Sequence, residues 1–327
     1  MIYSLSQYSL QGGRKSNQDR IAYAERENSI LMVLADGLGG HRGGDVAAEV
    51  FTESVIRSYL GIKNSFIKEP SAFLALAMLG AHHNVLAQRD VLGDNAKPRT
   101  TGVACLVQDG YAYWAHVGDS RLYHIRGGTV IERTRDHSVV ERMYSEGLIA
   151  KEEIRTHPQK SHITQCIGSS NKPKITLGKE TRLHTGDYLL LCSDGVWEGL
   201  PSPQLAAHLE NTSIEEAVEN ILHTVEDKMG AGCDNISIIA LKWQDRATTK
   251  PPLQKGFKTE ITEDVLREQA MAKSRRRAAS KPEPDHLPAD EPDSATTEVE
   301  PAHPDKRKDI GSEIAELEDF LKKKSQK

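Results

Sequence analysis

The sequence predicts an α+β sandwich followed by a largely disordered C-terminal tail. Strand-like apolar runs occur in neighbouring groups, and segments of helical periodicity lie between these groups. A doubly wound parallel sheet would instead need strict alternation of strands and helices. The composition then changes near Trp243, where apolar periodicity gives way to charged and proline-rich sequence. These observations place one packed domain ahead of a segment that cannot build a core.

The predicted strands are rich in Val, Ile, Leu or Tyr and are bounded by turn-forming residues. They span residues 30–35, 102–108, 112–117, 121–125, 188–192 and 236–243. Residues 102–134 form a continuous group that predicts an antiparallel meander, with turns at Asp109-Gly110 and Gly127-Gly128.

Two segments have a clear helical period, and a third has a weaker one. The first begins after Gly44 and places Val46, Ala47, Val50, Phe51, Val55 and Ser58 on one face. The second covers about 71–89 and carries Phe73, Leu76, Ala77, Leu79, Val85 and Leu86. The weaker segment is 214–229.

The tail sets the expected domain boundary, with one domain over residues 1–244 and the tail over 245–327. Residues 279–308 are rich in Pro, Glu, Asp, Ser and Thr, so they bury too little apolar surface to offset their chain entropy. Short helices are predicted at 262–276 and 312–325, behind the caps Thr262 and Ser312. They are either marginal solvated helices or docking helices for a protein partner.

Composition excludes several function classes. The 327 residues carry a formal net charge of −5, which argues against nucleic-acid or membrane-surface binding. We expect no signal peptide and no membrane span, because no basic-then-apolar leader or 18-residue apolar stretch occurs. The four cysteines form no C-x-x-C pair, which is typical of reduced thiols in a cytoplasmic protein.

Four aspartates mark strand ends and carry the chemistry. Asp36 ends an apolar run, Asp119 and Asp194 follow two others, and Asp234 precedes the last. Strand ends at one edge of a sheet can converge, and converging carboxylates repel one another without a cation. No Cys/His cluster accompanies them, so the ligands are all oxygen. That set favours Mg²⁺ or Mn²⁺ over zinc.

Residues beside these aspartates extend the interpretation. Gly37 lets the backbone approach an ion, so its carbonyl is a further candidate ligand. Bound divalent ions produce hydroxide from water and clamp a phosphate for in-line attack. Arg14, in the stretch G-G-R-K-S-N-Q-D, is the candidate to grip the remaining phosphate oxygens.

Seven short motifs occur in a fixed order: R-K-S-N-Q-D, D-G-L-G-G-H, T-T-G, G-D-S-R, R-D-H-S, S-D-G and D-N-I-S. In this order, over about residues 5–243, the chain resembles the metal-dependent protein phosphatase 2C (PPM-type) family, and most closely its bacterial branch. The resemblance implies a four-layer α-β-β-α sandwich of two antiparallel sheets flanked by helix pairs. It also implies hydrolysis of phosphoserine and phosphothreonine in proteins, a reaction that would reverse the action of a Ser/Thr kinase.

The resemblance implies a role for each site residue. Asp36 would bridge two ions, with the Gly37 carbonyl on one of them and Asp194 and Asp234 on the second. Asp119 would join Asp194 at a third ion. Asp19 would order metal-bound water, and Arg14 would bind the substrate phosphate. Residues 136–168 would form a flap beside the site, and we call this segment the flap.

The general acid is left open. Many eukaryotic members have His directly after the Asp-Gly, where this chain has Leu38. His41 is the nearest alternative proton donor, although a hydrogen-bonded loop histidine is an equally good interpretation. Metal-bound water is the other candidate.

Rival functions have weaker support. Six residues beyond the cysteines stand Tyr111, Lys172, Glu198 and Ile239, so no cysteine-phosphatase motif occurs. The aspartyl-phosphate, G-x-S-x-G and Walker motifs are also missing. A catalytically weak phosphatase-like module that binds phosphoproteins or a kinase is the alternative, and a metal-dependent nuclease or nucleotidase is a third hypothesis.

Overall fold

The computed structural model describes residues 1–38, 43–93, 96–210 and 212–245. The predicted tail helices at 262–276 and 312–325 therefore lie outside the described residues, and so does His41.

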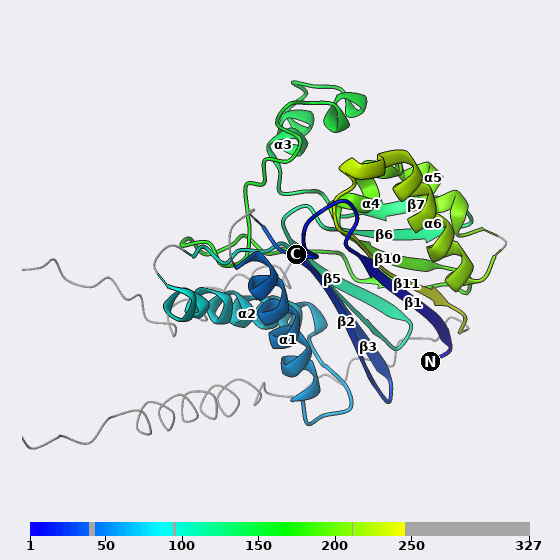
Figure 1. The fold of residues 1–327 in the computed structure, drawn as a ribbon. Coiled ribbons are helices and arrows are strands. Elements are labelled where there is room, and N and C mark those ends of the chain that lie inside the picture. The colour runs from blue at the N-terminus through cyan, green and yellow to red at the C-terminus, as the bar shows by residue number, and fades with distance from the viewer. Residues whose placement is uncertain (39–42, 94–95, 211, 246–327) are drawn as a thin grey trace, which may run out of the picture. The chain divides into compact units, whose positions relative to one another are not determined.

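Two antiparallel sheets form the centre of the described part (Figure 1). The first sheet has the order β1 (Tyr3–Leu10), β11 (Ile236–Trp243), β10 (Tyr188–Cys192), β6 (Arg121–Arg126), β7 (Thr129–Arg133). The second has the order β2 (Asp19–Arg26), β3 (Ser29–Asp36), β4 (Gly102–Gln108), β5 (Tyr111–Val117), β8 (Thr176–Leu177), and β9 (Thr181–Arg182) also pairs with β5. All of these pairings are antiparallel.

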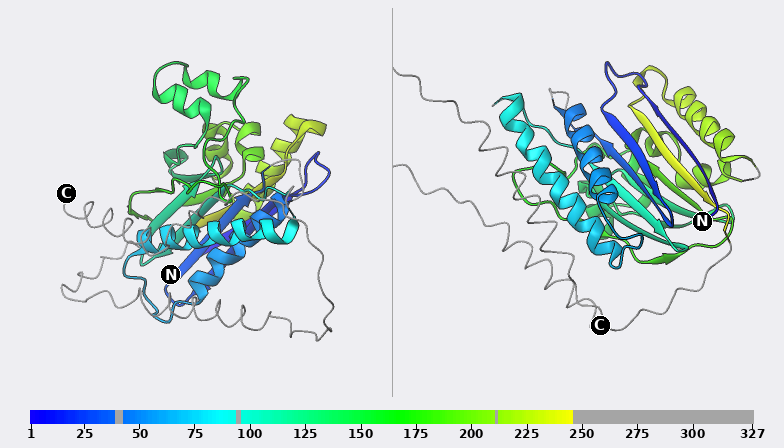
Figure 2. Two further views of the ribbon diagram at one scale, coloured as in Figure 1. Left: turned by 90° about the vertical axis from the view of Figure 1, so that its left-hand side faces the viewer. Right: turned by 90° about the horizontal axis from the view of Figure 1, so that it is seen from below.

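Helices cover the outer face of each sheet, as the two views in Figure 2 show. The second sheet is covered by α1 (Gly44–Leu60) and α2 (Pro70–Leu92), and the first by α4 (Asp194–Gly199), α5 (Ser202–His208) and α6 (Ile214–Met229). A 3-10 turn, η2 (Gly230–Gly232), follows α6. The flap contains α3 (Val139–Ser145) and η1 (Lys151–Arg155), which stand away from both sheets in Figure 1.

Three apolar layers hold these four structural layers together. Strand β3 shows why, because both of its faces are buried and side chains alternate across a strand. One face packs under α1 and α2 and the other meets the first sheet; the two sets are Leu31, Val33, Ala35 and Ile30, Met32, Leu34. The predicted four-layer sandwich is therefore confirmed.

Most predicted elements are found. The six strands match β3, β4, β5, β6, β10 and β11, and the weaker helix matches α6. Both predicted turns contain residues with positive φ, at Asp109, Gly110, Gly127 and Gly128. All four cysteines are free thiols. None of the helices in the described ranges is long and apolar enough to traverse a bilayer.

Two predicted core positions are wrong. Leu76 is 38% exposed because the buried face of α2 runs through Leu74, Ala77 and Met78 instead. Tyr59, not Ser58, completes the buried face of α1. Strands β1, β2 and β7 were not predicted from the sequence, because their residues are mostly half-buried and include many polar side chains.

Candidate active site

Five aspartates from both sheets occupy the same end of the sandwich. Asp19 opens β2 and Asp36 ends β3, and these two residues stand directly opposite each other in the strand pairing. Asp119 follows β5, Asp194 opens α4 directly after β10, and Asp234 precedes β11. The sequence prediction expected four of these carboxylates to converge, and the structure adds Asp19 as a direct neighbour of Asp36.

The five aspartates repel one another, and the described part of the chain places too little positive charge among them to balance their own. The pKa of Asp36 is raised well above its usual value, first by burial and then by the charges of Asp194, Asp19, Asp119 and Asp234. Burial also raises the pKa of Asp194, followed by the charges of Asp119 and Asp234. Carboxylates in this setting either keep their protons or share a cation.

Asp19 and Asp119 each carry a buried oxygen without a hydrogen-bond partner among the described residues. Ser193 Oγ donates to Asp19 Oδ2 at 2.8 Å, which leaves Oδ1 unpaired. Burial is the main reason that the pKa of Asp19 rises to about 6 and that of Asp119 to about 7. Because buried oxygens without partners are rare, these two atoms fit a site built for divalent cations.

Arg14 does not stand free above the site. Its Nε donates to Asp234 Oδ1 at 2.7 Å and its Nη2 to Oδ2 at 2.5 Å. The guanidinium side chain is still 60% exposed. The structure therefore pairs the predicted phosphate-binding residue with a predicted ion ligand, which the sequence analysis had treated as separate.

The carboxylates are near one another but do not enclose a common point. Across the described ranges, no three His, Cys, Asp or Glu side chains form a ready metal cage. One of the carboxylates, Asp234, is paired with Arg14 instead. The assignment of individual ligands therefore stays a prediction.

Gly37 is required by its surroundings. A Cβ added there would lie 2.4 Å from the Gly44 carbonyl oxygen, so no other residue fits. Its N–H donates to the Gln18 carbonyl at 3.2 Å, and the following Leu38 N–H donates to the Arg99 carbonyl at 2.8 Å. This close backbone packing supports a role for the Gly37 carbonyl, which stays a prediction.

Two polar residues next to the aspartates were not predicted as part of the site. The Asn235 side chain accepts the Gln18 N–H at 2.9 Å and donates to the carbonyls of Gln11 and Ser16, so it shapes the loop that carries Arg14. Ser193 donates to Asp19 and accepts the Ser237 N–H at 3.0 Å. Both residues belong to motifs already noted, S-D-G and D-N-I-S, and that membership was the available signal.

A family comparison decides the class of the protein. Residues 8–230 match the model of the family described as protein phosphatase 2C. The chain belongs to this family. The predictions of the family and of a phosphatase are thereby confirmed.

Named relatives agree with this membership. The chain is 30% identical over 232 residues to the protein phosphatase PhpP of Streptococcus pneumoniae, a match covering 69% of this chain and 91% of that protein. It is 32% identical over 232 residues to the serine/threonine protein phosphatase PstP of Mycobacterium tuberculosis, covering 69% of this chain and 42% of that longer protein.

Solved structures support the same fold. The serine/threonine phosphatase of S. agalactiae superimposes with a TM-score of 0.67 at 29% identity, covering 74% of this chain and all of that one (100%). The catalytic domain of the phosphatase PstP, solved with two manganese ions, gives a TM-score of 0.62 at 26% identity, covering 74% of this chain and 99% of that one.

Proposed function

We propose that this protein hydrolyses phosphoserine and phosphothreonine in proteins with the help of divalent metal ions, Mn²⁺ or Mg²⁺. The observation that carries the proposal is the group of mutually repelling aspartates from both sheets, with unpaired buried oxygens on Asp19 and Asp119. When bound, such ions lower the pKa of a coordinated water and offset the charge on a phosphate. No covalent intermediate is needed.

In this proposal each site residue has one task. Two ions, or three, are held by the side chains of Asp36, Asp119, Asp194 and Asp234 and the carbonyl of Gly37. Asp36 would help to hold two of these ions, and Asp119 would hold the third together with Asp194. Asp19, which lies opposite Asp36 and is fixed by Ser193, orients the attacking water. Arg14 binds the phosphate, which requires its release from Asp234.

The proposal leaves two candidate donors for the proton that the departing alkoxide takes up. Leu38 has no titratable group, so the residue after Asp36-Gly37 cannot supply it. His41 lies outside the described residues, and its role as proton donor stays a prediction. A water at the site is the other donor.

The proposal extends to the organisation and partners of the chain. Residues 1–244 suffice for hydrolysis, and the segment 245–327 recruits a protein partner. A Ser/Thr kinase supplies the phosphorylated substrates. The protein works in the cytoplasm, where its four free thiols stay reduced.

Hydrolysis of a phosphothreonine peptide tests the proposal directly. We expect turnover with Mn²⁺, its loss with EDTA, and its return when Mn²⁺ is added in excess. The Asp36→Asn variant serves as the inactive control. A protein that binds the phosphopeptide tightly without turnover would instead be a phosphatase-like scaffold, and the proposal would be wrong.

A further inference from the structure

Two arginines from separate elements lie beside the last residues of the flap. Arg89 belongs to the last turn of α2, and its Nη2 donates to the Gly168 carbonyl at 2.9 Å. Arg99 directly precedes Thr100, whose N–H and carbonyl pair with the backbone of Ile167 at 3.2 and 2.8 Å. The two arginines, which we call the arginine pair, are half-buried and border the same stretch of chain.

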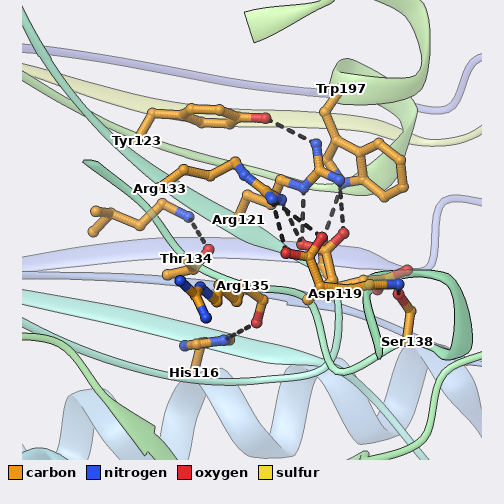
Figure 3. A network of polar contacts seen from close by, with 12 residues as sticks. His116, Asp119, Arg121, Tyr123, Arg133, Thr134, Arg135, Ser138 and Trp197 are labelled. Carbon is orange, nitrogen blue, oxygen red and sulfur yellow. Dashed lines mark hydrogen bonds and ion pairs between the residues drawn. The ribbon is translucent and has the colours of Figure 1, made fainter. Parts of the chain in front are cut away.

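The arginine pair lacks the carboxylate partner that Arg121 and Arg133 have. Those two residues both donate to Asp136, and Figure 3 shows them with their hydrogen bonds. The Nε of Arg89 and that of Arg99 are buried, and neither donates to a described residue. Within the described ranges, neither arginine makes an ion pair with a carboxylate. Because a buried donor without an acceptor is costly, these groups indicate a site for an anion.

Cys166 detects the same excess of positive charge. It is half-buried, whereas the other three cysteines are buried. Burial raises the pKa of its thiol, and the charges of Arg99 and then Arg89 lower this pKa in part. Both guanidinium groups therefore lie near this sulfur, because the interaction between charges falls off with distance. The two charges that act on Cys166 are both positive.

The arginine pair adjoins the group of aspartates. The Arg99 carbonyl accepts the Leu38 N–H at 2.8 Å, and Leu38 is the second residue after Asp36. Thr100 Oγ1 donates to the Asp36 carbonyl at 2.8 Å. An extended peptide advances roughly 3.3 Å per residue, so side chains within a few positions of a phosphoresidue bound at the aspartates can reach this pair.

We propose that the arginine pair forms an oxyanion subsite for a second acidic group of the substrate protein, either the carboxylate of a nearby Asp or Glu or the phosphate of a second phosphorylated residue. Guanidinium groups hold either oxyanion with two parallel hydrogen bonds. The inference rests on the proposed function and adds a preference to it, for substrates that are acidic or phosphorylated beside the residue that is hydrolysed. The subsite binds and selects, and it takes no part in the chemical step.

A glutamate scan of the substrate tests the subsite. Each peptide carries one phosphothreonine in a background of alanine and glycine, with a single glutamate placed at one position, up to about four residues away on either side. The preference is the ratio of kcat/KM for such a peptide to kcat/KM for the glutamate-free peptide, measured on the full chain with Mn²⁺. We expect this ratio to reach a maximum of about tenfold at one position, as a charged hydrogen bond provides.

Arg99 supplies the decisive variants, because its side chain donates to no described residue. Arg99→Gln should bring the ratio close to one, and Arg99→Glu should make lysine better than glutamate at the preferred position. Arg89→Gln should also lower the ratio, although it loses the bond to Gly168 as well. Arg57→Gln removes an exposed positive charge of α1 that pairs with Glu53, so this control should keep the wild-type ratio.

Alkylation of Cys166 measures the same charges without any turnover. Iodoacetate is an anion and iodoacetamide is neutral, so the ratio of their rates at one thiol cancels the thiolate fraction and measures the local charge. Mass spectrometry assigns both rates to Cys166 in protein kept in EDTA. Arg99→Gln should lower this ratio about threefold, as loss of a unit charge several ångströms away does, whereas Arg99→Lys and Arg57→Gln should retain it. An unchanged ratio in Arg99→Gln would overturn the inference.

Three results of the peptide scan would also overturn it. The first is a wild type for which glutamate gives no advantage at any position. The second is an Arg99→Gln variant with the wild-type preference, and the third is an Arg57→Gln variant that loses as much of this preference as Arg99→Gln does. Inorganic phosphate that slows iodoacetate at Cys166, without any advantage for acidic peptides, would identify free phosphate as the ligand and would equally rule out a substrate subsite.

The glutamate-free peptide separates this inference from the proposed function. Its Mn²⁺-dependent hydrolysis by the wild type would show that the proposed function stands, whichever result the scan gives. Failure to hydrolyse any of the peptides would refute the proposed function and the inference together.

Discussion

The guanidinium of Arg14 holds both carboxylate oxygens of Asp234, with Nε 2.7 Å from Oδ1. The carboxylate also raises the pKa of Arg14, through their hydrogen bond and then through its charge. A side-chain cation thus occupies the position where we propose a metal ion to bind. In the proposed function, Arg14 and the ion would therefore compete for Asp234, and Arg14 would become available to a phosphate once the ion had displaced it.

Removing Arg14 separates its two roles. Exposed ion pairs contribute no more than about 1 kcal/mol, so Arg14→Ala should tighten Mn²⁺ binding by at most about fivefold. Loss of a charged hydrogen bond to phosphate should raise KM for a phosphothreonine peptide about tenfold or more. Calorimetric Mn²⁺ titration and steady-state kinetics measure the two effects. Weaker Mn²⁺ binding in the variant would contradict the competition.

Asp36→Asn should abolish turnover without unfolding the protein. Loss of a bridging ligand should lower kcat at least about 100-fold, because even contacts that only support a ligand contribute up to that much. The metal-free variant should be at least as stable as the wild type, because desolvation and the charges of four other carboxylates raise the pKa of Asp36. Thermal unfolding in EDTA checks the fold, and undiminished activity would show that the ligand assignment is wrong.

Metal-free protein should lose stability as the pH rises. The folded-state pKa values of Asp19 and Asp119 are raised to about 6 and about 7, above the ordinary value of 3.8. Through these two carboxyl groups the folded state binds more protons than the unfolded state, so their contribution to stability is largest at acidic pH and falls until the pH passes about 7. Unfolding in EDTA from about pH 5 to pH 8 measures this decline. Saturating Mn²⁺ should raise the melting temperature most at the alkaline end, and a rise that does not grow with pH would contradict this prediction.

His82, a buried residue of α2 that bonds the end of the flap, should have the opposite effect on the pH dependence of stability. His82 Nδ1 accepts the Gly168 N–H at 3.1 Å, and burial lowers the pKa of His82 to about 4. Because the unfolded state binds the extra proton first, stability should fall as the pH drops from about 6.5 toward 4, by on the order of 2 kcal/mol at about pH 5. His82→Gln keeps an acceptor but does not titrate. Denaturant unfolding at about pH 6.5 and about pH 5 should show that this variant loses less unfolding free energy on acidification than the wild type does.

Removing residues 250–327 should leave hydrolysis of small phosphate esters unchanged. The described residues that form the three apolar layers all precede this segment. The kinetic constants for p-nitrophenyl phosphate and the melting temperature of the truncated protein test the expectation. A marked fall in melting temperature would mean that the segment contributes to the packed domain.

The sequence predicted those parts of the fold in which both faces of a strand are buried. Residues 30–35 of β3 are a continuous apolar run, and β11 is apolar apart from Ser237 and Lys242. Strands β1 and β2 lie at the edges of their sheets, so they carry polar residues on their half-buried faces and lack this signal. Pairing with β11 and β3, rather than composition, makes them strands.

The sequence was sufficient to predict which acidic residues converge, but not the contacts that hold them in place. Strand-end position identified Asp36, Asp119, Asp194 and Asp234, because glycine and polar neighbours mark them in the sequence. The pairing of Arg121 with Asp136 joins residues fifteen apart across a turn of the chain, and no local pattern encodes such a contact. Arg14 and Asp234, 220 positions apart, meet for the same reason.

Strand β1 pairs with β11 along its whole length, from Tyr3 opposite Trp243 to Leu10 opposite Ile236. A ribosome must therefore synthesise almost all of the packed domain before the first strand finds its neighbour. Such distant pairing makes folding slow. The loop carrying Arg14 follows this first strand and Asp234 precedes its partner. In the proposed function, a nascent or prematurely terminated chain would therefore lack an assembled centre and would not remove phosphates while it is still being made.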